Sequence, residues 1–137
     1  MTKGSYPDTF YRVSIKAIIR DSEGRLLLVR EKGHEDYALP GGGLGHGESA
    51  HDCLVRELYE ELELTSPFAE HAVAARQKFL DSRNAYLLWV VYEIDYESLE
   101  FSVGTDAEAV GWFAPDEIIT NNEEAKLTKS ILENELA

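Results

Sequence analysis

The chain is short of cysteine, of long apolar runs and of basic residues. Its one cysteine, Cys53, cannot form a disulfide within the chain, which favours a reducing compartment. The longest apolar run, residues 85–92, is far below the ~20 residues that a membrane helix needs. The first residues also lack the apolar core of a signal peptide. We therefore expect a soluble cytoplasmic protein with no membrane partner.

The charge balance narrows the class of partner. The chain has 13 basic and 26 acidic residues, for a formal net charge of −13 at pH 7. A field of this sign repels nucleic-acid backbones, so a DNA or RNA polymer is not an expected partner. A small phosphorylated ligand is not excluded, because bound divalent cations reverse the sign of the field locally.

The length and the order of apolar segments predict one domain spanning residues 1–137. Alternating and apolar residues predict a β-hairpin at residues 11–31, with its turn at residues 21–24. A short extended piece follows at residues 37–39, where Pro40 ends it. A second and longer hairpin is predicted at residues 69–95, because two β-rich segments flank a polar turn.

The C-terminal part mixes a strand with helices. A strand at residues 108–113 precedes Pro115, which suits the first turn of a short helix at residues 115–120. Asn121 or Asn122 is a candidate cap for a last helix. The inward-facing residues of that helix are expected to be Leu127, Ile131 and Leu136. Together, these segments predict an α+β fold in which helices flank a mixed sheet.

A glycine-rich turn leads directly into an acidic helix. Residues 40–43 read Pro-Gly-Gly-Gly, and glycines let the backbone approach a ligand closely. Ser49 begins the helix, Asp52 takes the third position of a capping-box variant, and the helix is predicted to run to about Leu62.

Three glutamates of this helix lie close to its apolar side. On a helical wheel Glu57 and Glu61 fall at the edge of the apolar stripe, and Glu60 lies just beyond it. Carboxylates three and four residues apart repel one another, and partial burial raises that cost. A salt-bridge ladder is the alternative, but Arg56 alone cannot neutralise all three charges. The helix therefore predicts a divalent cation. The apolar stripe consists of Ala50, Leu54, Leu58 and Leu62.

The spacing over residues 42–64 is G-x5-E-x7-R-E-U-x-E-E-x-x-U, where U is an aliphatic residue. This spacing resembles the Nudix box, the signature of Nudix hydrolases. The resemblance implies an α/β/α sandwich around a mixed sheet, and hydrolysis of nucleoside diphosphates linked to another moiety with Mg²⁺ or Mn²⁺. The residues that carry it are Gly42, Glu48, Arg56, Glu57, Leu58, Glu60, Glu61 and Leu64.

The resemblance also implies roles for individual residues. Glu48 would support the metal site, and Arg56 would orient the acidic cluster rather than bind substrate. The general base that accepts the proton of the attacking water would be Glu57, with Glu108 second and Asp106 third. The metal-binding residues that it implies are Gly41, through its carbonyl oxygen, and Glu57, Glu60 and Glu61.

One position departs from the family pattern. Glu63 stands where the family has a glycine, two residues after the paired glutamates. That glycine permits a left-handed backbone at the end of the helix, so Glu63 is expected to be strained there unless the helix runs on.

Residues that touch the substrate are harder to predict. The basic residues expected near a phosphate are Arg30, Lys32, Arg76, Lys78 and Arg83, of which Arg30, Arg76 and Lys78 are the main candidates. Arg76 and Lys78 would share one strand face. The candidates for stacking on a base are Tyr37, Phe79, Tyr86 and Trp89, although strand aromatics are usually core residues. The histidines lack zinc-like spacing, and Cys53 is expected to pack.

The sequence thus predicts a metal-dependent Nudix hydrolase that cleaves a diphosphate linkage in a nucleotide sugar, an ADP-ribose-like compound or a similar small nucleoside diphosphate derivative. Two alternatives stay open: a pyrophosphatase acting on (d)NTPs, and a Nudix-like module that senses a nucleotide without turnover. The substrate is not specified by the box, because selectivity in a fold comes from residues outside it. The sequence equally leaves open whether the protein forms a homodimer.

Overall fold

The computed structural model describes residues 10–119 and 122–135, which form two sheets and two α-helices. The larger sheet has the strand order β3-β1-β5-β4, and the smaller one pairs β2 with β6. Strand β1 pairs antiparallel with β3 and parallel with β5, so the larger sheet is mixed, as predicted. The strands are β1 (Tyr11–Ile18), β2 (Leu26–Glu31), β3 (Gly41–Gly43), β4 (Phe68–Leu80), β5 (Ala85–Tyr96) and β6 (Ala107–Phe113), and the helices are α1 (Ala50–Leu62) and α2 (Glu123–Glu135).

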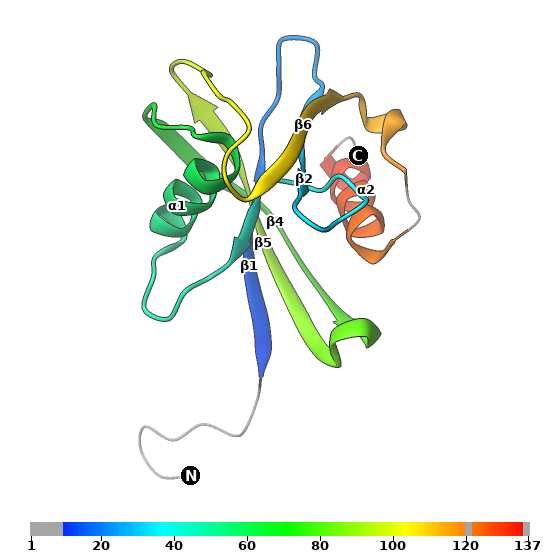
Figure 1. Cartoon of the computed structure of the whole chain (residues 1–137). Helices are drawn as coiled ribbons and strands as arrows, with labels where there is room; N and C mark the ends of the chain where they lie inside the picture. The colour runs from blue at the N-terminus through cyan, green and yellow to red at the C-terminus, as the bar shows by residue number, and fades with distance from the viewer. Residues whose placement is uncertain (1–9, 120–121, 136–137) are drawn as a thin grey trace.

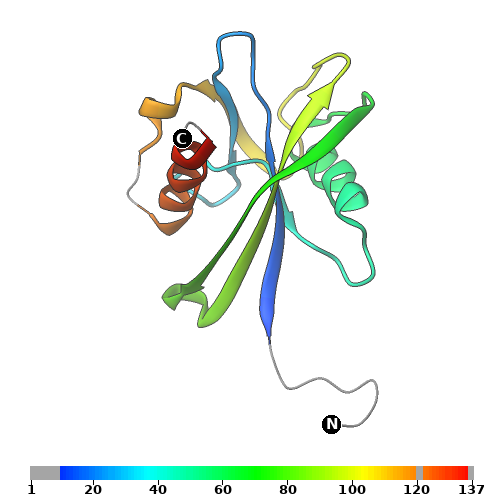
Figure 2. The same cartoon turned by 180° about the vertical axis from the view of Figure 1, so that it is seen from behind.

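The two helices lie on opposite sides of the sheets, as Figures 1 and 2 show. Successive side chains of β2 point to opposite faces of the strand, and both faces are buried. Leu27 and Val29 pack in the core cluster of α1, whereas Leu26 and Leu28 pack in that of α2. Trp89 of β5 belongs to the α2 cluster. The β4–β5 hairpin and the start of β1 extend beyond the helices at one end of the molecule (Figure 1). The predicted α+β fold with helices flanking a mixed sheet is confirmed.

The first predicted hairpin is only partly right. Its turn is present, because the Asp21 carboxylate accepts hydrogen bonds from the amides of Glu23 and Arg25 at 2.9 and 2.8 Å. The two strands, however, pair with each other only at an isolated Arg20–Leu26 bridge and then separate into the two sheets. The local pattern correctly marks the strands and the turn, but the long-range partners β5 and β6 take over the pairing.

The second predicted hairpin is confirmed as β4 and β5, which pair antiparallel along their length with one bulge between Ala72 and Ala74. A 3₁₀ turn, Asp81–Arg83, joins them. The extended piece before Pro40 is present as a bridge between Val29 and Ala38.

The helices begin where their caps predict. Ser49 Oγ accepts a hydrogen bond from the Asp52 amide at 3.1 Å at the start of α1. Asn122 Oδ1 accepts one from the Ala125 amide at 2.8 Å before α2, while Asn121 and Leu136 lie outside the described residues. Leu127 and Ile131 are buried. Pro115 opens a 3₁₀ turn, Pro115–Glu117, in place of a longer helix. Within the described ranges, no helix is long and apolar enough to cross a membrane.

Candidate active site

Glu61 is the most buried carboxylate of the site. It projects from the last turn of α1 with 1% of its surface exposed, and its Oε1 accepts a hydrogen bond from the Gly41 amide at 2.8 Å. Its Oε2 is buried and has no hydrogen-bond partner. Burial raises the pKa of Glu61 to about 8, although the Gly41 amide and the charge of Lys16 act in the opposite direction. A buried carboxylate oxygen without a hydrogen-bond partner is costly unless a proton or a cation neutralises it.

Arg56 holds the neighbouring glutamates. Its Nη1 lies 2.8 Å from Glu57 Oε1 and 3.5 Å from Glu60 Oε2. Glu60 is less buried than Glu61, and desolvation, together with the charges of Glu57 and Asp106, raises its pKa. The carboxylates therefore repel one another, and Arg56 compensates only from one side.

Glu48 anchors Arg56 in turn. Arg56 Nε donates to Glu48 Oε2 at 2.9 Å and Arg56 Nη2 donates to Glu48 Oε1 at 3.0 Å, a two-pronged contact that fixes the plane of the guanidinium. The Gly45 amide also donates to Glu48 Oε1 at 2.9 Å. The Arg56 hydrogen bonds and this amide lower the pKa of Glu48 to about 2. Arg56 thus links Glu48 to Glu57 through its guanidinium.

The three glycines of β3 leave room for these contacts. A Cβ on Gly42 would lie 2.6–2.8 Å from the carboxylate atoms of Glu57, and one on Gly41 would lie 2.1 Å from the Ile15 carbonyl oxygen. Gly41 also has a φ of 123°, in the region that glycine favours. The backbone of β3 can therefore lie directly against the α1 carboxylates. The Gly41 carbonyl that was expected to bind metal belongs to this same segment.

A small cavity of about 400 Å³ opens at the acidic cluster. The loop after β5 closes its far side, because the amides of Gly104 and Asp106 donate to the Glu61 and Glu60 carbonyl oxygens at the end of α1. This brings the Asp106 side chain to the cavity. The lining residues are Glu31, Lys32, Gly42, Gly43, Glu57, Glu60, Glu61 and Asp106.

Glu108, the second-choice base from the sequence, lies elsewhere. Its Oε2 is 2.8 Å from Arg30 Nη1, and its Oε1 accepts from the Gly33 amide at 3.3 Å. A bulge in the β2–β6 pairing skips Glu108, since Arg30 pairs with Ala109 and Glu31 with Ala107. Glu108 does not line the acidic cavity, whereas Asp106 does.

The residues of the acidic cavity fit a divalent metal ion. Apart from Lys32, its charged side chains are carboxylates, whose oxygens are the ligands of hard cations, and Glu61 supplies a buried oxygen without a partner. No group of three or more His, Cys, Asp or Glu among residues 10–119 and 122–135 is already arranged to hold a metal. Glu57 and Glu60 lie beside Arg56 instead, so a bound cation would compete with Arg56 for their oxygens.

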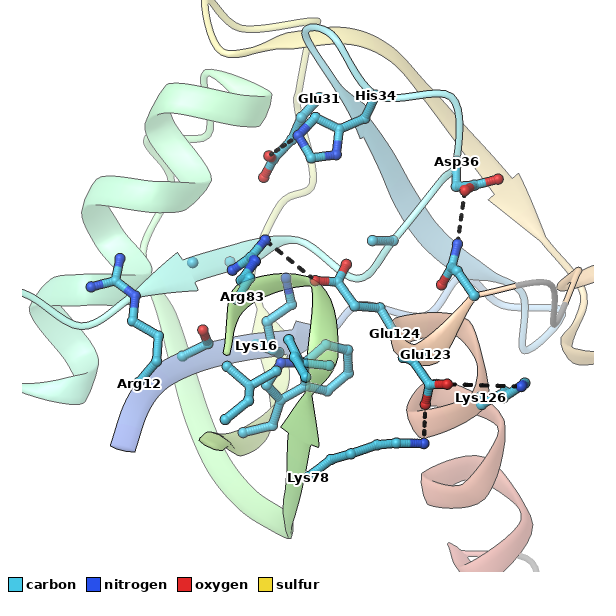
Figure 3. Close-up of a pocket in the computed structure, with 18 of the residues that line it drawn as sticks. Arg12, Lys16, Glu31, His34, Asp36, Lys78, Arg83, Glu123, Glu124 and Lys126 are labelled. Atoms are coloured by element: carbon cyan, nitrogen blue, oxygen red, sulfur yellow. Dashed lines mark hydrogen bonds and ion pairs between the residues drawn. The ribbon is translucent and has the colours of Figure 1, made fainter. Parts of the chain in front are cut away.

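A larger cavity, of about 680 Å³, adjoins the acidic one and shares Glu31, Gly42 and Gly43 with it. Figure 3 shows it between β1, the β4–β5 hairpin and the start of α2. Of the three main substrate candidates, only Lys78 lines it, where it pairs with Glu123. The other basic residues of this lining are Arg12, Lys16, Arg83 and Lys126.

Arg30 and Arg76 do not line either cavity. Arg30 pairs with Glu108, and Arg76 donates to the Ala75 carbonyl oxygen at 2.9 Å. Arg12 and Lys16, which line the larger cavity, are not among the basic residues that the sequence predicts near a phosphate. The pattern that could have identified them is the alternation of Arg12, Ser14 and Lys16 along β1, because alternate residues of a strand share one face.

The aromatic residues divide between core and surface. Trp89 is buried beneath the Lys16 ammonium, which lies 5.3 Å from the centroid of its ring. Tyr37 packs on Phe113 at the rim of the larger cavity, with a centroid distance of 4.8 Å. Phe79 and Tyr86 contact each other and remain 39% and 47% exposed, so these two strand aromatics are not core residues.

Two further expectations concern α1 itself. Glu63 adopts a left-handed backbone, with φ 50° and ψ 30°, so the helix ends at Leu62 and does not run on. The Glu63 amide then donates to the Tyr59 carbonyl oxygen at 2.9 Å, which is the bond that closes a left-handed helix end of the kind glycine favours. Cys53 is fully buried in the core cluster of α1, and burial raises the pKa of its thiol to about 11.

Comparisons with known proteins agree with this geometry. The model of the NUDIX domain family matches residues 10–133. A crystal structure of a MutT NUDIX hydrolase from Burkholderia pseudomallei is 27% identical with a TM-score of 0.75, covering 91% of this chain and 98% of that one. The NUDIX domain of Shewanella oneidensis NrtR, complexed with ADP ribose, is 15% identical with a TM-score of 0.73, covering 98% and 96% of the two chains, and it shows the fold alone.

A curated relative matches a shorter part of the chain. An RNA pyrophosphohydrolase of Shewanella denitrificans is 39% identical over 54 residues, which are 39% of this chain and 31% of that protein. The match thus spans about a third of the length of that relative.

A mixed sheet with one helix on either side (Figures 1 and 2) defines the Nudix class of fold. The match over residues 10–133 shows that the chain belongs to the NUDIX domain family, so the resemblance seen in the sequence is confirmed.

Proposed function

We propose that the protein hydrolyses the diphosphate linkage of a small nucleoside diphosphate derivative, with Mg²⁺ or Mn²⁺ at the acidic cavity. The observation that carries the proposal is Glu61 Oε2, a buried carboxylate oxygen without a partner beside Glu57 and Glu60. Such a group is costly unless a proton or a cation neutralises it, and a cation there is suited to neutralising a diphosphate. Gly41 and the three glutamates are the residues that would hold the metal ion.

The chemistry divides between the metal and the chain. A bound divalent ion supplies charge withdrawal from the phosphoryl oxygens and a lowered pKa for a water molecule. Glu57 is the proposed base that takes the proton of the attacking water. Asp106 replaces Glu108 as the second candidate, because it lines the cavity and Glu108 does not. Glu48 fixes Arg56, and Arg56 keeps Glu57 in place.

The larger cavity supports a substrate with a sizeable non-reacting part. It adjoins the acidic cavity along Gly42 and Gly43, so a molecule bound by its diphosphate at α1 can extend into it. Its volume of about 680 Å³ falls in the range of cavities that hold small organic ligands. A nucleotide sugar and an ADP-ribose-like compound both match this arrangement.

Hydrolysis of (d)NTPs and of RNA 5′ ends are the competing activities, and the second is suggested by the relatives that are RNA pyrophosphohydrolases. The net charge of −13 disfavours an RNA chain, because a protein of this charge repels the RNA backbone at long range. A sensor without turnover has no need of a complete set of carboxylates.

The test is turnover of a panel with Mg²⁺ or Mn²⁺: ADP-ribose, nucleotide sugars, dinucleoside polyphosphates, dNTPs and a 5′-triphosphorylated oligonucleotide. We expect Glu57→Gln to lower kcat by at least about 10³-fold on the preferred compound while the fold is kept. Glu100→Gln removes the same charge from an exposed position outside both cavities and serves as the control. Unchanged turnover in Glu57→Gln would overturn the mechanism, and tight binding without any turnover would favour the sensor.

A further inference from the structure

Five basic residues line the larger cavity, and two of them differ from the rest. Lys78 and Lys126 both pair with Glu123, and Arg83 lies 4.0 Å from Glu124. The side chains of Arg12 and Lys16 have no hydrogen bond or ion pair among the described residues. In a chain with twice as many acids as bases, two cations without a carboxylate partner in one cavity are unexpected.

Lys16 is the more unusual of the two. It is 7% exposed, yet within residues 10–119 and 122–135 the one partner found for its ammonium is the ring of Trp89. Glu61 interacts with it electrostatically but is not within ion-pair distance. A buried ammonium loses hydration that one aromatic ring replaces only in part, so its place on the wall of an open cavity favours an anion in front of it.

Arg12 lies at the seam between the two cavities. A Cβ on Gly43 would fall 2.3 Å from Arg12 Nη2, so the guanidinium rests directly on the bare backbone of β3. Gly43 lines both cavities. Arg12, Ser14 and Lys16 alternate along β1 and share its cavity face, and Figure 3 shows Arg12 and Lys16 arising from this one strand.

We propose that Arg12 and Lys16 form a phosphate subsite of the larger cavity that binds without a metal ion. It would hold a phosphate group attached to the part of the ligand in this cavity, next to the group bound at the α1 carboxylates. The proposal rests on the proposed function only in that the natural occupant would be a phosphate-bearing substrate or product of that hydrolysis.

The chemistry of the pair supports a phosphate over a neutral group. An arginine guanidinium offers paired donors that match phosphate oxygens, and the lysine ammonium adds a point charge. The two residues belong to the same strand, so the sheet fixes their separation before any ligand binds. Because the metal-binding carboxylates lie on α1, removing the metal leaves this pair in place.

The experiment measures binding to the full chain in EDTA at 150 mM salt, by calorimetry. The probes are AMP, GMP, CMP and UMP, the four corresponding nucleosides, and inorganic pyrophosphate. We expect at least one phosphate-bearing probe to bind in EDTA, and its nucleoside to bind at least tenfold more weakly. Arg12→Gln and Lys16→Met should each weaken that probe about tenfold or more, with recovery in Lys16→Arg.

Arg83→Gln is the matched control, since it removes a cation from the same cavity that already lies near Glu124. It should change binding by less than threefold. Arg12 is exposed, so Arg12→Gln tests the subsite even if Lys16→Met fails to fold. Absence of binding by every phosphate-bearing probe in EDTA would overturn the proposal, as would equal binding by wild type and Arg12→Gln.

The Glu57→Gln variant separates this proposal from the proposed function. It should keep the EDTA binding and lose turnover. If the wild-type protein binds the monophosphate through Arg12 in EDTA but hydrolyses nothing on the panel, the phosphate subsite is supported and the proposed hydrolase activity is refuted.

Discussion

Replacing Glu61 with glutamine should make the metal-free protein more stable at alkaline pH. Glu61 is 1% exposed, its Oε2 has no partner, and burial raises its pKa to about 8 from an ordinary value of 4.5. The unfolded chain therefore releases this proton at much lower pH than the folded protein does. Glutamine keeps an oxygen to accept the Gly41 amide and carries no charge at any pH.

The sign and size follow from proton linkage. Because the folded-state pKa lies above the unfolded-state value, the stability that neutral Glu61 contributes is fully present below about pH 4.5. It is lost as the pH rises towards 8 and changes little above that. At about 1.4 kcal/mol per pKa unit, the whole difference is on the order of 5 kcal/mol. That is a large share of the 5–15 kcal/mol that stabilises a typical domain.

The assay is urea unfolding of wild type and Glu61→Gln in EDTA between pH 5 and 9. We expect the free energy of unfolding of the variant, relative to wild type, to rise by several kcal/mol between pH 5 and 8. The contributions of the other titrating groups to the free energy of unfolding are the same in both proteins and cancel in this difference. Saturating Mg²⁺ or Mn²⁺ at pH 8 should stabilise wild type, by about 2.7 kcal/mol at a hundred times the Kd, and stabilise the variant less. A difference that is flat with pH would refute the reasoning about Glu61.

Three further outcomes test the geometry around α1. Glu63→Gly should raise the free energy of unfolding by about 1 kcal/mol in thermal or urea unfolding, because φ 50° disfavours a residue with a Cβ. Gly42→Ala should lower kcat at least about tenfold at nearly unchanged stability, since its Cβ would displace the Glu57 carboxylate. Glu48→Gln should lower kcat by about tenfold with little change in KM, because Arg56 loses a charged partner. A free energy of unfolding equal to wild type in Glu63→Gly, or a kcat equal to wild type in Gly42→Ala or Glu48→Gln, would contradict the argument for that variant.

Local chemistry explains what the sequence could predict of this fold. Ser49 and Asn122 mark two helix starts because a cap acts within three residues, and the β4–β5 pair follows from two adjacent β-rich segments. Partner choice is different. Strand β1 reads as a hairpin partner of β2, yet it pairs with β5, which lies more than 60 residues further along the chain. Nothing within β1 distinguishes these partners, because register and pairing depend on the whole core.

The acidic cluster was predictable because its geometry is that of one helix. Residues at i, i+3 and i+4 share a face of any helix, so Glu57, Glu60 and Glu61 follow from the sequence alone. The loop acids were not predictable in the same way. Whether Asp106 or Glu108 reaches the cavity depends on a bulge between β2 and β6, and a bulge reverses which residues face inward.

Lys16 was missed for a reason that applies to other sheets. Charged and apolar residues alternate along β1, which is the usual sign of a strand with one face in water. Helix α2 and the β4–β5 hairpin instead enclose a cavity over that second face. A charged side chain on this second face of the strand therefore lines the cavity and has less access to water than it would have on an open sheet. A buried polar residue on a strand that is covered on both sides therefore indicates a ligand more strongly than the same residue on an open sheet, and in β1 that residue is Lys16.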